Sequence, residues 1–221
     1  MATLSTLLDR EGLPTSERLL IKIATCTWTD DREVLSDCVR RCRSEGMSRD
    51  LLEEVLLQAI LFCGFPRAIT AFGTLKEEWP TASPPLGGHL APSQQREAGV
   101  GLFDAIYGKN CESIKELLRS YHSELHDFIL DAAYGRILTR PGLETRIREL
   151  VAVGVLALAD QIPQLIAHGR GALRLGASAQ EVREAIFTAI EDDEKTEEMM
   201  LLIRRKPSGK GSGPGEGSSW K

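Results

Sequence analysis

The fold is decided by two matching stretches of sequence, GLPTSERLL at residues 12–20 and GLETRIREL at residues 142–150. They open two segments, 12–60 and 142–190, that align without gaps at a constant offset, and 13 of the 49 aligned pairs are identical. The identical pairs include Gly12 and Gly142, Arg18 and Arg148, Gly46 and Gly176, and Glu54 and Glu184. Internal repetition of this kind indicates that one structural unit occurs twice in the chain.

Each copy of the repeat is predicted to form three helices, because its apolar residues recur at steps of three and four. Asp30 in the first copy and Asp160 in the second are expected to cap the second helix with their short carboxylates. Gly46 and Gly176 are expected to end that helix in the left-handed conformation that glycine tolerates. The pattern therefore predicts an all-α protein.

Changes in composition divide the chain into four parts. Residues 1–80 form the first unit, and the Pro- and Gly-rich segment 81–95 is predicted to be a linker. Residues 96–203 form the second unit, which begins with helical segments that the first unit lacks. Within it, the acidic run 191–198 is expected to be a solvated helix end. The Gly/Ser-rich tail 204–221 is predicted to be disordered.

The overall composition of the 221 residues is that of a globular protein, with 42% hydrophobic residues and a net charge of −5. The negative charge argues against a duplex nucleic-acid partner, whose phosphates demand cations. No apolar run reaches the ~20 residues of a membrane span, and the N-terminus does not resemble a secretory signal. The five cysteines follow no disulfide framework. These features predict a cytoplasmic protein with reduced thiols.

Two stretches resemble a known family. They are YGRILTRPGL at residues 134–143, which continues into the helix after Arg148, and EEVLLQ at residues 53–58, which leads to CGFP at residues 63–66. Both resemble the carboxymuconolactone decarboxylase family, whose members have the alkyl hydroperoxidase D-like fold. Residues 96–108 resemble the N-terminal helix of that family. The resemblance implies a duplicated alkyl hydroperoxidase D-like helical bundle that assembles into a homo-oligomer.

In the peroxidase branch of that family, a glutamate is followed by a CxxC pair and then by a histidine. At this spacing the second copy holds Glu149, Gln161, Gln164 and His168. The glutamate and the histidine are present, whereas glutamine replaces both cysteines. In the first copy the same positions hold Leu19, Asp31, Val34 and Cys38. The first repeat is therefore degenerate at these positions, and dithiol chemistry is not expected in the second.

The decarboxylase branch of the family also lacks the CxxC pair and keeps the histidine. Gln161, Gln164 and His168 are expected on one helical face, with Glu149 on the preceding antiparallel helix. The resemblance implies acid–base catalysis by His168 and Glu149 on a small carboxylate or lactone acid, without metal or cofactor. Gln161 and Gln164 are candidates for substrate binding. A bidentate clamp on the substrate carboxylate could come from Arg140, Arg148 or Arg170.

Three other interpretations stay open. His168 and the two glutamines could simply form a hydrogen-bonded helix face, with Glu149 in a salt bridge to a nearby arginine. The protein could then be a non-catalytic oligomeric scaffold or binding module. Alternatively, Cys38 and Cys42, one helical turn apart, could retain a thiol-dependent peroxidase activity, although small buried thiols are the commoner role for such residues.

Overall fold

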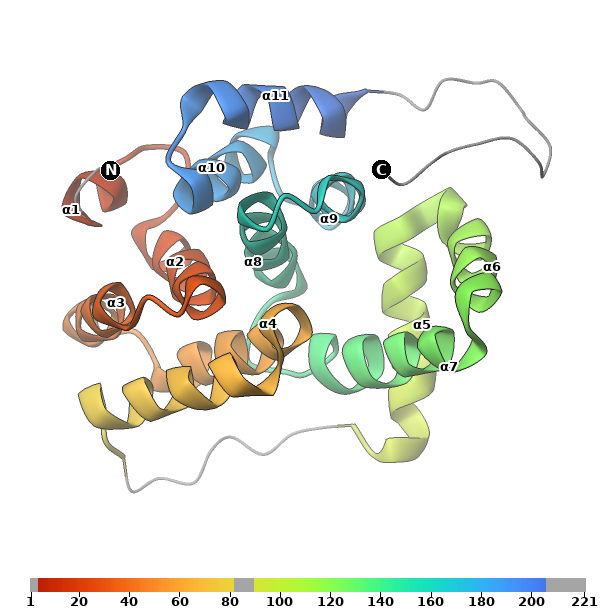
Figure 1. The fold of residues 1–221 in the computed structure, drawn as a ribbon, viewed down its shortest axis with the longest axis horizontal. Helices are drawn as coiled ribbons and strands as arrows, with labels where there is room; N and C mark the ends of the chain where they lie inside the picture. The colour runs from red at the N-terminus through yellow and green to blue at the C-terminus, as the bar shows by residue number, and fades with distance from the viewer. Residues whose placement is uncertain (1–3, 82–89, 206–221) are drawn as a thin grey trace.

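The computed structural model describes residues 4–81 and 90–205, and within these ranges the chain forms helices and no strands. The all-α prediction is therefore confirmed. The two repeats lie against each other, with their first helices side by side at the centre of the molecule (Figure 1). Most of the remaining helices surround this central pair.

The first repeat comprises a short N-terminal helix and three longer ones: α1 (Leu4–Leu8), α2 (Thr15–Thr29), α3 (Arg32–Ser44) and α4 (Arg49–Glu78). The second repeat comprises α8 (Thr145–Leu158), α9 (Ile162–Arg174), α10 (Ala179–Ile190) and α11 (Asp193–Arg204). Helices α2, α3 and the start of α4 match α8, α9 and α10 at the offset seen in the sequence. The three predicted helices are thus present in each copy.

The glycines at the joints behave as predicted. Gly46 follows α3 with a φ of 70°, and Gly176 follows α9 with a φ of 98°. Both values lie in the left-handed region that residues with a Cβ avoid. The two units therefore turn at the same place and in the same way.

The two aspartates at the other joint act differently from the prediction. Asp30 and Asp160 have φ values of 58° and 54°, so they end the preceding helix instead of capping the next one. The cap of α3 comes from Asp31, whose carboxylate accepts a hydrogen bond of 3.1 Å from the N–H of Val34. A short polar side chain at a left-handed position is the less common alternative to glycine there.

Helix α4 is long and apolar enough, by length and composition, to cross a membrane. It is not straight, however, because Gly64 has a non-helical φ of 71° and Pro66 follows it. The Nε of Arg49 donates a 2.9 Å hydrogen bond to the carbonyl oxygen of Trp79, so the two ends of α4 meet. A straight helix of 30 residues would hold them ~45 Å apart. The element is therefore a helical hairpin folded onto the first repeat.

Most of the acidic run 191–198 starts a helix, which corrects the prediction of a solvated helix end. Glu191 ends α10 with a φ of 52°, and the carboxylate of Asp192 caps α11. Glu191 also lies 2.7 Å from the Nζ of Lys22 in the first repeat. Helix α11 packs against α9 and α10.

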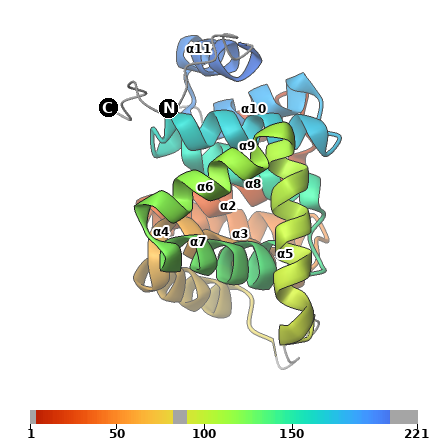
Figure 2. The same cartoon turned by 90° about the vertical axis from the view of Figure 1, so that its right-hand side faces the viewer.

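An insertion of helices separates the repeats and lies on one side of the molecule, beside α9 (Figures 1 and 2). Its elements are α5 (Pro92–Tyr107), the short η1 (Gly108–Asn110), α6 (Cys111–Tyr121), α7 (Ser123–Phe128) and the π-helix η2 (Ile129–Leu138). Helix α5 begins inside the segment 81–95 that was predicted to be linker. Residues 82–89 of that segment, and residues 206–221 of the predicted tail, lie outside the described residues.

Two buried ion pairs join the repeats reciprocally. Arg18 of the first repeat lies 3.1 Å from Glu184 of the second, and Arg148 of the second lies 2.7 Å from Glu54 of the first. All four side chains are at most 4% exposed. Apolar residues of both repeats surround them in one continuous core. The duplicated units are therefore halves of one packed body.

A second, smaller core lies between α5 and η2, with Phe103, Ile106, Leu130, Tyr134 and Leu138 at its centre. The two helices touch backbone to backbone at Gly99 and Gly135. A Cβ on Gly99 would lie 2.6 Å from the backbone nitrogen of Gly135, and one on Gly135 would lie 2.5 Å from the carbonyl oxygen of Gln95. This close contact sets how the insertion faces α9.

Candidate functional site

The structure brings together the two residues expected to act as an acid–base pair. Nδ1 of His168, on α9, donates to Oε2 of Glu149, on α8, over 3.0 Å. The Glu149 side chain is 1% exposed and that of His168 is 12% exposed. The carboxylate is thus sealed in the protein, while the imidazole reaches the surface. Within the described residues, Nε2 of His168 has no hydrogen-bond partner.

The pair has a defined electrostatic character. Burial lowers the pKa of His168, but the charge of Glu149 and its hydrogen bond raise it by more, so the net pKa lies above the ordinary value. At neutral pH this favours an imidazolium, which is a proton donor at Nε2. The arrangement can orient one tautomer and deliver one proton outward.

Glycine at position 171 makes room for the carboxylate. A Cβ on Gly171 would lie 2.7 Å from Oε2 of Glu149 and 2.8 Å from Cγ2 of Ile106. Since Gly171 is on α9 and Ile106 is on α5, the carboxylate lies where the insertion meets the second repeat. Neither residue was singled out from the sequence, because their importance depends on a contact between distant segments.

Two tyrosines complete the surroundings of His168. The ring of Tyr107, at the end of α5, stands edge-on to that of His168 with centroids 6.3 Å apart and planes at 67°. The hydroxyl of Tyr134, on η2, donates to the hydroxyl of Tyr107 over 3.3 Å. The expected resemblance of residues 96–108 to the family's first helix pointed to the α5 segment, but nothing in the sequence showed that Tyr107 reaches α9.

Three of the other predicted residues do not join the pair. Gln161 and Gln164 are exposed to solvent, and the Nε2 of Gln161 donates only to the nearby carbonyl oxygen of Ala159. Arg170 points to the end of α11, where its Nε donates to the carbonyl oxygen of Ile203 over 2.9 Å. Arg170 therefore ties α9 to α11.

Arg140 and Arg148 are committed to a carboxylate of the protein itself. Arg140 lies 2.8 Å and Arg148 2.7 Å from the two oxygens of Glu54, and all three side chains are nearly or fully buried. Burial raises the pKa of Glu54, but the two guanidinium groups lower it by more. The alternative interpretation expected a salt bridge between Glu149 and a nearby arginine. In the structure, Glu149 is instead hydrogen-bonded to His168.

Three of the thiols of the first repeat are buried. Cys26, Cys38 and Cys42 are at most 4% exposed. A hydrogen bond to Cys26 and burial raise the pKa of Cys38 well above its ordinary value, and burial raises that of Cys42 to about 12. Since the thiolate is the nucleophile, these cysteines are poorly suited to peroxide chemistry.

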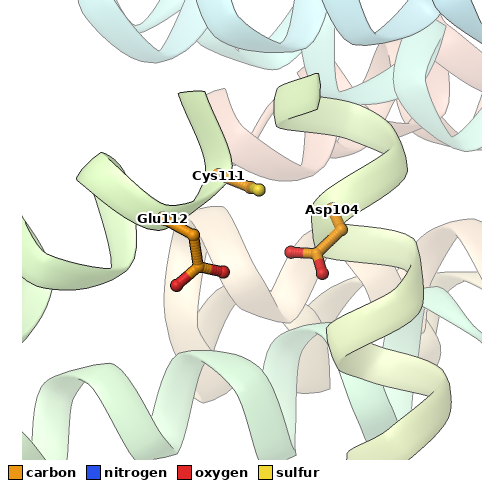
Figure 3. A group of neighbouring side chains, drawn as sticks. All are labelled: Asp104, Cys111 and Glu112. Carbon is orange, nitrogen blue, oxygen red and sulfur yellow. The ribbon is translucent and has the colours of Figure 1, made fainter. Parts of the chain in front are cut away.

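One group of metal-ligand type side chains is present in the described part of the chain. Asp104, Cys111 and Glu112 place their ligand atoms within 4.8 Å of one another, between α5 and α6 (Figure 3). However, the Nζ of Lys115 lies 2.6 Å from Asp104 and 2.9 Å from Glu112. Since this buried ammonium already pairs with both carboxylates, the group is best described as an ion-pair network that joins the two helices.

The fold and the site together define a duplicated all-α bundle in which a carboxylate–histidine pair joins α8 to α9. The model of the carboxymuconolactone decarboxylase family matches residues 1–77 and 124–202, which is more than half of the chain. The chain belongs to this family, and the two matched regions correspond to the two repeats. Residues 78–123, which include α5 and Tyr107, lie outside the matched regions.

Two named proteins are similar to the chain in sequence. Peroxisomal protein 2 of Schizosaccharomyces pombe is 27% identical over 173 residues, which are 71% of this chain and 80% of that protein. The 4-carboxymuconolactone decarboxylase of Acinetobacter baylyi is 28% identical over 95 residues, which are 42% of this chain and 71% of that protein. The chain is similar to both.

Proposed function

We propose that the protein catalyses acid–base decarboxylation of a small carboxylate of the lactone-acid type, with His168 as the proton donor and Glu149 as the group that holds and charges it. The observation that carries the proposal is the 3.0 Å bond between a sealed carboxylate and an imidazole that reaches the surface. The name of the Acinetobacter baylyi relative supports the reaction class.

The chemistry requires only a proton and a site for the substrate. In an unsaturated γ-lactone acid, the bond between the ring and the carboxylate carbon breaks and carbon dioxide leaves. The electron pair spreads through the conjugated system to the lactone carbonyl oxygen. Nε2–H of His168 then protonates the vinylogous ring carbon, which is the one next to the lactone carbonyl. His168 regains a proton from solvent. Proton delivery of this kind contributes ~10²–10⁴-fold to a rate.

The structure gives less support to the alternatives. Thiol-dependent peroxidase activity would need a thiolate, and Cys38 and Cys42 are buried with raised pKa values. Assembly into a homo-oligomer is compatible with either a catalytic or a scaffold role. Phe65, Ile69 and Phe128 support such an assembly, because each is at least 68% exposed. The cytoplasmic location stays a prediction.

The test is the release of carbon dioxide from 4-carboxymuconolactone by the wild type, His168→Gln and Glu149→Gln. We expect His168→Gln to lower the rate about 10²-fold or more. His122→Gln, which removes an exposed imidazole elsewhere, is the matched control and should keep the wild-type rate. Equal rates for the wild type and His168→Gln would contradict the proposal.

The pH dependence gives a second signature. Only the protonated imidazole donates, so the rate should fall as pH rises through the raised pKa of His168. In Glu149→Gln the raising carboxylate is lost, and the falling limb should move to lower pH. A limb that stays in place in Glu149→Gln would show that this pair does not supply the proton.

A further inference from the structure

Tyr107 is placed beside His168 with an unused hydroxyl proton. Its oxygen accepts the hydrogen bond of Tyr134, and among the described residues its own O–H has no acceptor. Tyr134 is 4% exposed and Tyr107 is half-buried. The buried hydroxyl of Tyr134 therefore has its hydrogen-bond acceptor in Tyr107. The hydroxyl proton of Tyr107 is available to a ligand that binds beside His168.

The position of Tyr107 is fixed from several sides. Its ring packs on Phe103 with centroids 4.3 Å apart, and its neighbour Ile106 contacts Gly171 at the base of the acid–base pair. Arg174, six residues after His168 on α9, donates to the carbonyl oxygen of Ile106. The end of α5 is therefore attached to the same helix that carries His168.

A phenol in this setting stays protonated. Burial raises the pKa of Tyr107, the hydrogen bond from Tyr134 lowers it by less, and the charge of Glu149 raises it further. Because a hydroxyl that accepts one hydrogen bond becomes a stronger donor in the next, the chain from Tyr134 to Tyr107 favours an anionic oxygen as the final acceptor.

We propose that Tyr107 is a catalytic residue that donates a hydrogen bond to the substrate oxygen on which negative charge develops, with Tyr134 as its positioning residue. This inference deepens the proposed function and rests on it for the reaction that produces the oxyanion. In a lactone acid the acceptor is the carbonyl oxygen that receives the electron pair when carbon dioxide leaves. A fixed donor at such an oxygen stabilises the transition state more than the substrate.

The proposal is tested by binding as well as by turnover. The probe is 4-nitrophenol, a small planar phenol whose anion imitates a delocalised oxyanion and absorbs visible light. We expect the wild type to bind the phenolate and to lower the apparent pKa of the bound probe. Tyr107→Phe should weaken binding about tenfold and abolish the pKa shift of the probe.

Two further variants separate the roles. Tyr134→Phe should leave binding detectable but reduce the pKa shift of the probe, because the donor from Tyr107 is no longer strengthened. Tyr121→Phe is the control, since Tyr121 is 56% exposed at the end of α6, and it should match the wild type. If Tyr107→Phe lowered thermal stability yet left the affinity and the pKa of the probe unchanged, Tyr107 would be structural and the proposal would be overturned.

Turnover of 4-carboxymuconolactone distinguishes this inference from the proposed function. Phenolate binding that depends on Tyr107, without release of carbon dioxide, would support the oxyanion donor and reject the decarboxylase. Turnover that depends on His168 but is unaffected in Tyr107→Phe would support the decarboxylase and reject the oxyanion donor.

Discussion

The interaction of Glu149 with His168 depends on the residues that bury its carboxylate. One oxygen of its carboxylate bonds to His168 and lies directly over Gly171, and the whole side chain is 1% exposed. A buried carboxylate needs a partner of this kind, because an uncompensated charge in the interior is costly. The imidazole that compensates it is, for the same reason, held in its protonated form up to a higher pH.

The first prediction concerns Gly171→Ala. The added Cβ would lie 2.7 Å from Oε2 of Glu149, so the carboxylate must move away from His168. We expect the pKa of His168, measured by NMR titration, to fall towards that of an ordinary buried histidine. Gly169→Ala on the same helix would meet Ile203 instead and is the control: it should lower stability and leave the His168 pKa in place. An unchanged pKa in Gly171→Ala would contradict the geometry.

The sequence predicted part of the candidate site at this scale. Helical spacing put His168 on a defined face, and the family resemblance matched it with Glu149. The arginines could not be assigned in the same way, because Arg148 has a carboxylate next to it in sequence and yet bonds to Glu54, 94 residues away. Likewise, the sequence did not show which of the neighbouring Asp30 and Asp31 would take the left-handed conformation and which would cap α3. That choice depends on how two helices pack.

Helix η2 is the element that sets the tyrosines in place. It packs on α5 through the contact between Gly99 and Gly135, and it carries Tyr134 one residue before that glycine. A π-helix is rare and is found disproportionately at functional sites. The wider turn and the missing side chains together let two helices meet at backbone distance, which brings the two hydroxyls within reach.

The second prediction concerns Gly99→Ala. Its Cβ would lie 2.6 Å from backbone atoms of η2, which cannot rotate away as a side chain can. We expect a loss of ~1–3 kcal/mol in the free energy of unfolding and weaker binding of 4-nitrophenol. Gly101→Ala on the same helix has no atom within 4 Å of its Cβ, so it should be neutral or gain up to ~1 kcal/mol from helix propensity. Denaturant unfolding of both variants provides the comparison, and equal stabilities would argue against the contact.

The helices themselves were largely predictable, whereas some of the connections between them were not. Apolar spacing predicted the three helices of each repeat and the helical segments of the insertion. The reversal of α4 at Gly64 was not predicted, although Gly64 and Pro66 interrupt the apolar helical pattern there. Helix α11 was missed because an acidic run is equally typical of a solvated helix end and of a first helical turn.

At the scale of the whole molecule, buried ion pairs connect the two repeats. Arg18 bonds to Glu184 and Arg148 bonds to Glu54, so each half supplies the carboxylate that the other half's arginine requires. The alignment of the two repeats showed that Arg18 matches Arg148 and that Glu54 matches Glu184. That they pair across the repeats became evident only from the packing.

The third prediction concerns Arg148→Met. The substitution leaves Glu54 buried with only Arg140 as its cationic partner, and removing one member of a buried pair costs ~3–5 kcal/mol. We expect a loss of this order in denaturant unfolding, and a smaller loss when Glu54→Gln is added. The stability gap to the wild type should shrink as pH falls through the lowered pKa of Glu54, since protonation removes the unpaired charge.

The control for this prediction is Arg32→Met, whose partner Asp30 is 44% exposed. Exposed pairs of this kind contribute little, so the change should stay within ~0.5 kcal/mol. If Arg148→Met were as mild as Arg32→Met, the buried pairs would not be what joins the halves.

The reciprocity of the two ion pairs is the contact pattern of a symmetric dimer, in which residue i meets j and j meets i. In a dimer of identical chains every substitution is made twice, so a site residue can be lost only from both subunits at once. In this chain the two halves are covalently joined, and a substitution changes one half alone. The chain can therefore carry Cys38 where its other half carries His168. A single polypeptide can in this way hold different residues at matching positions of its two halves.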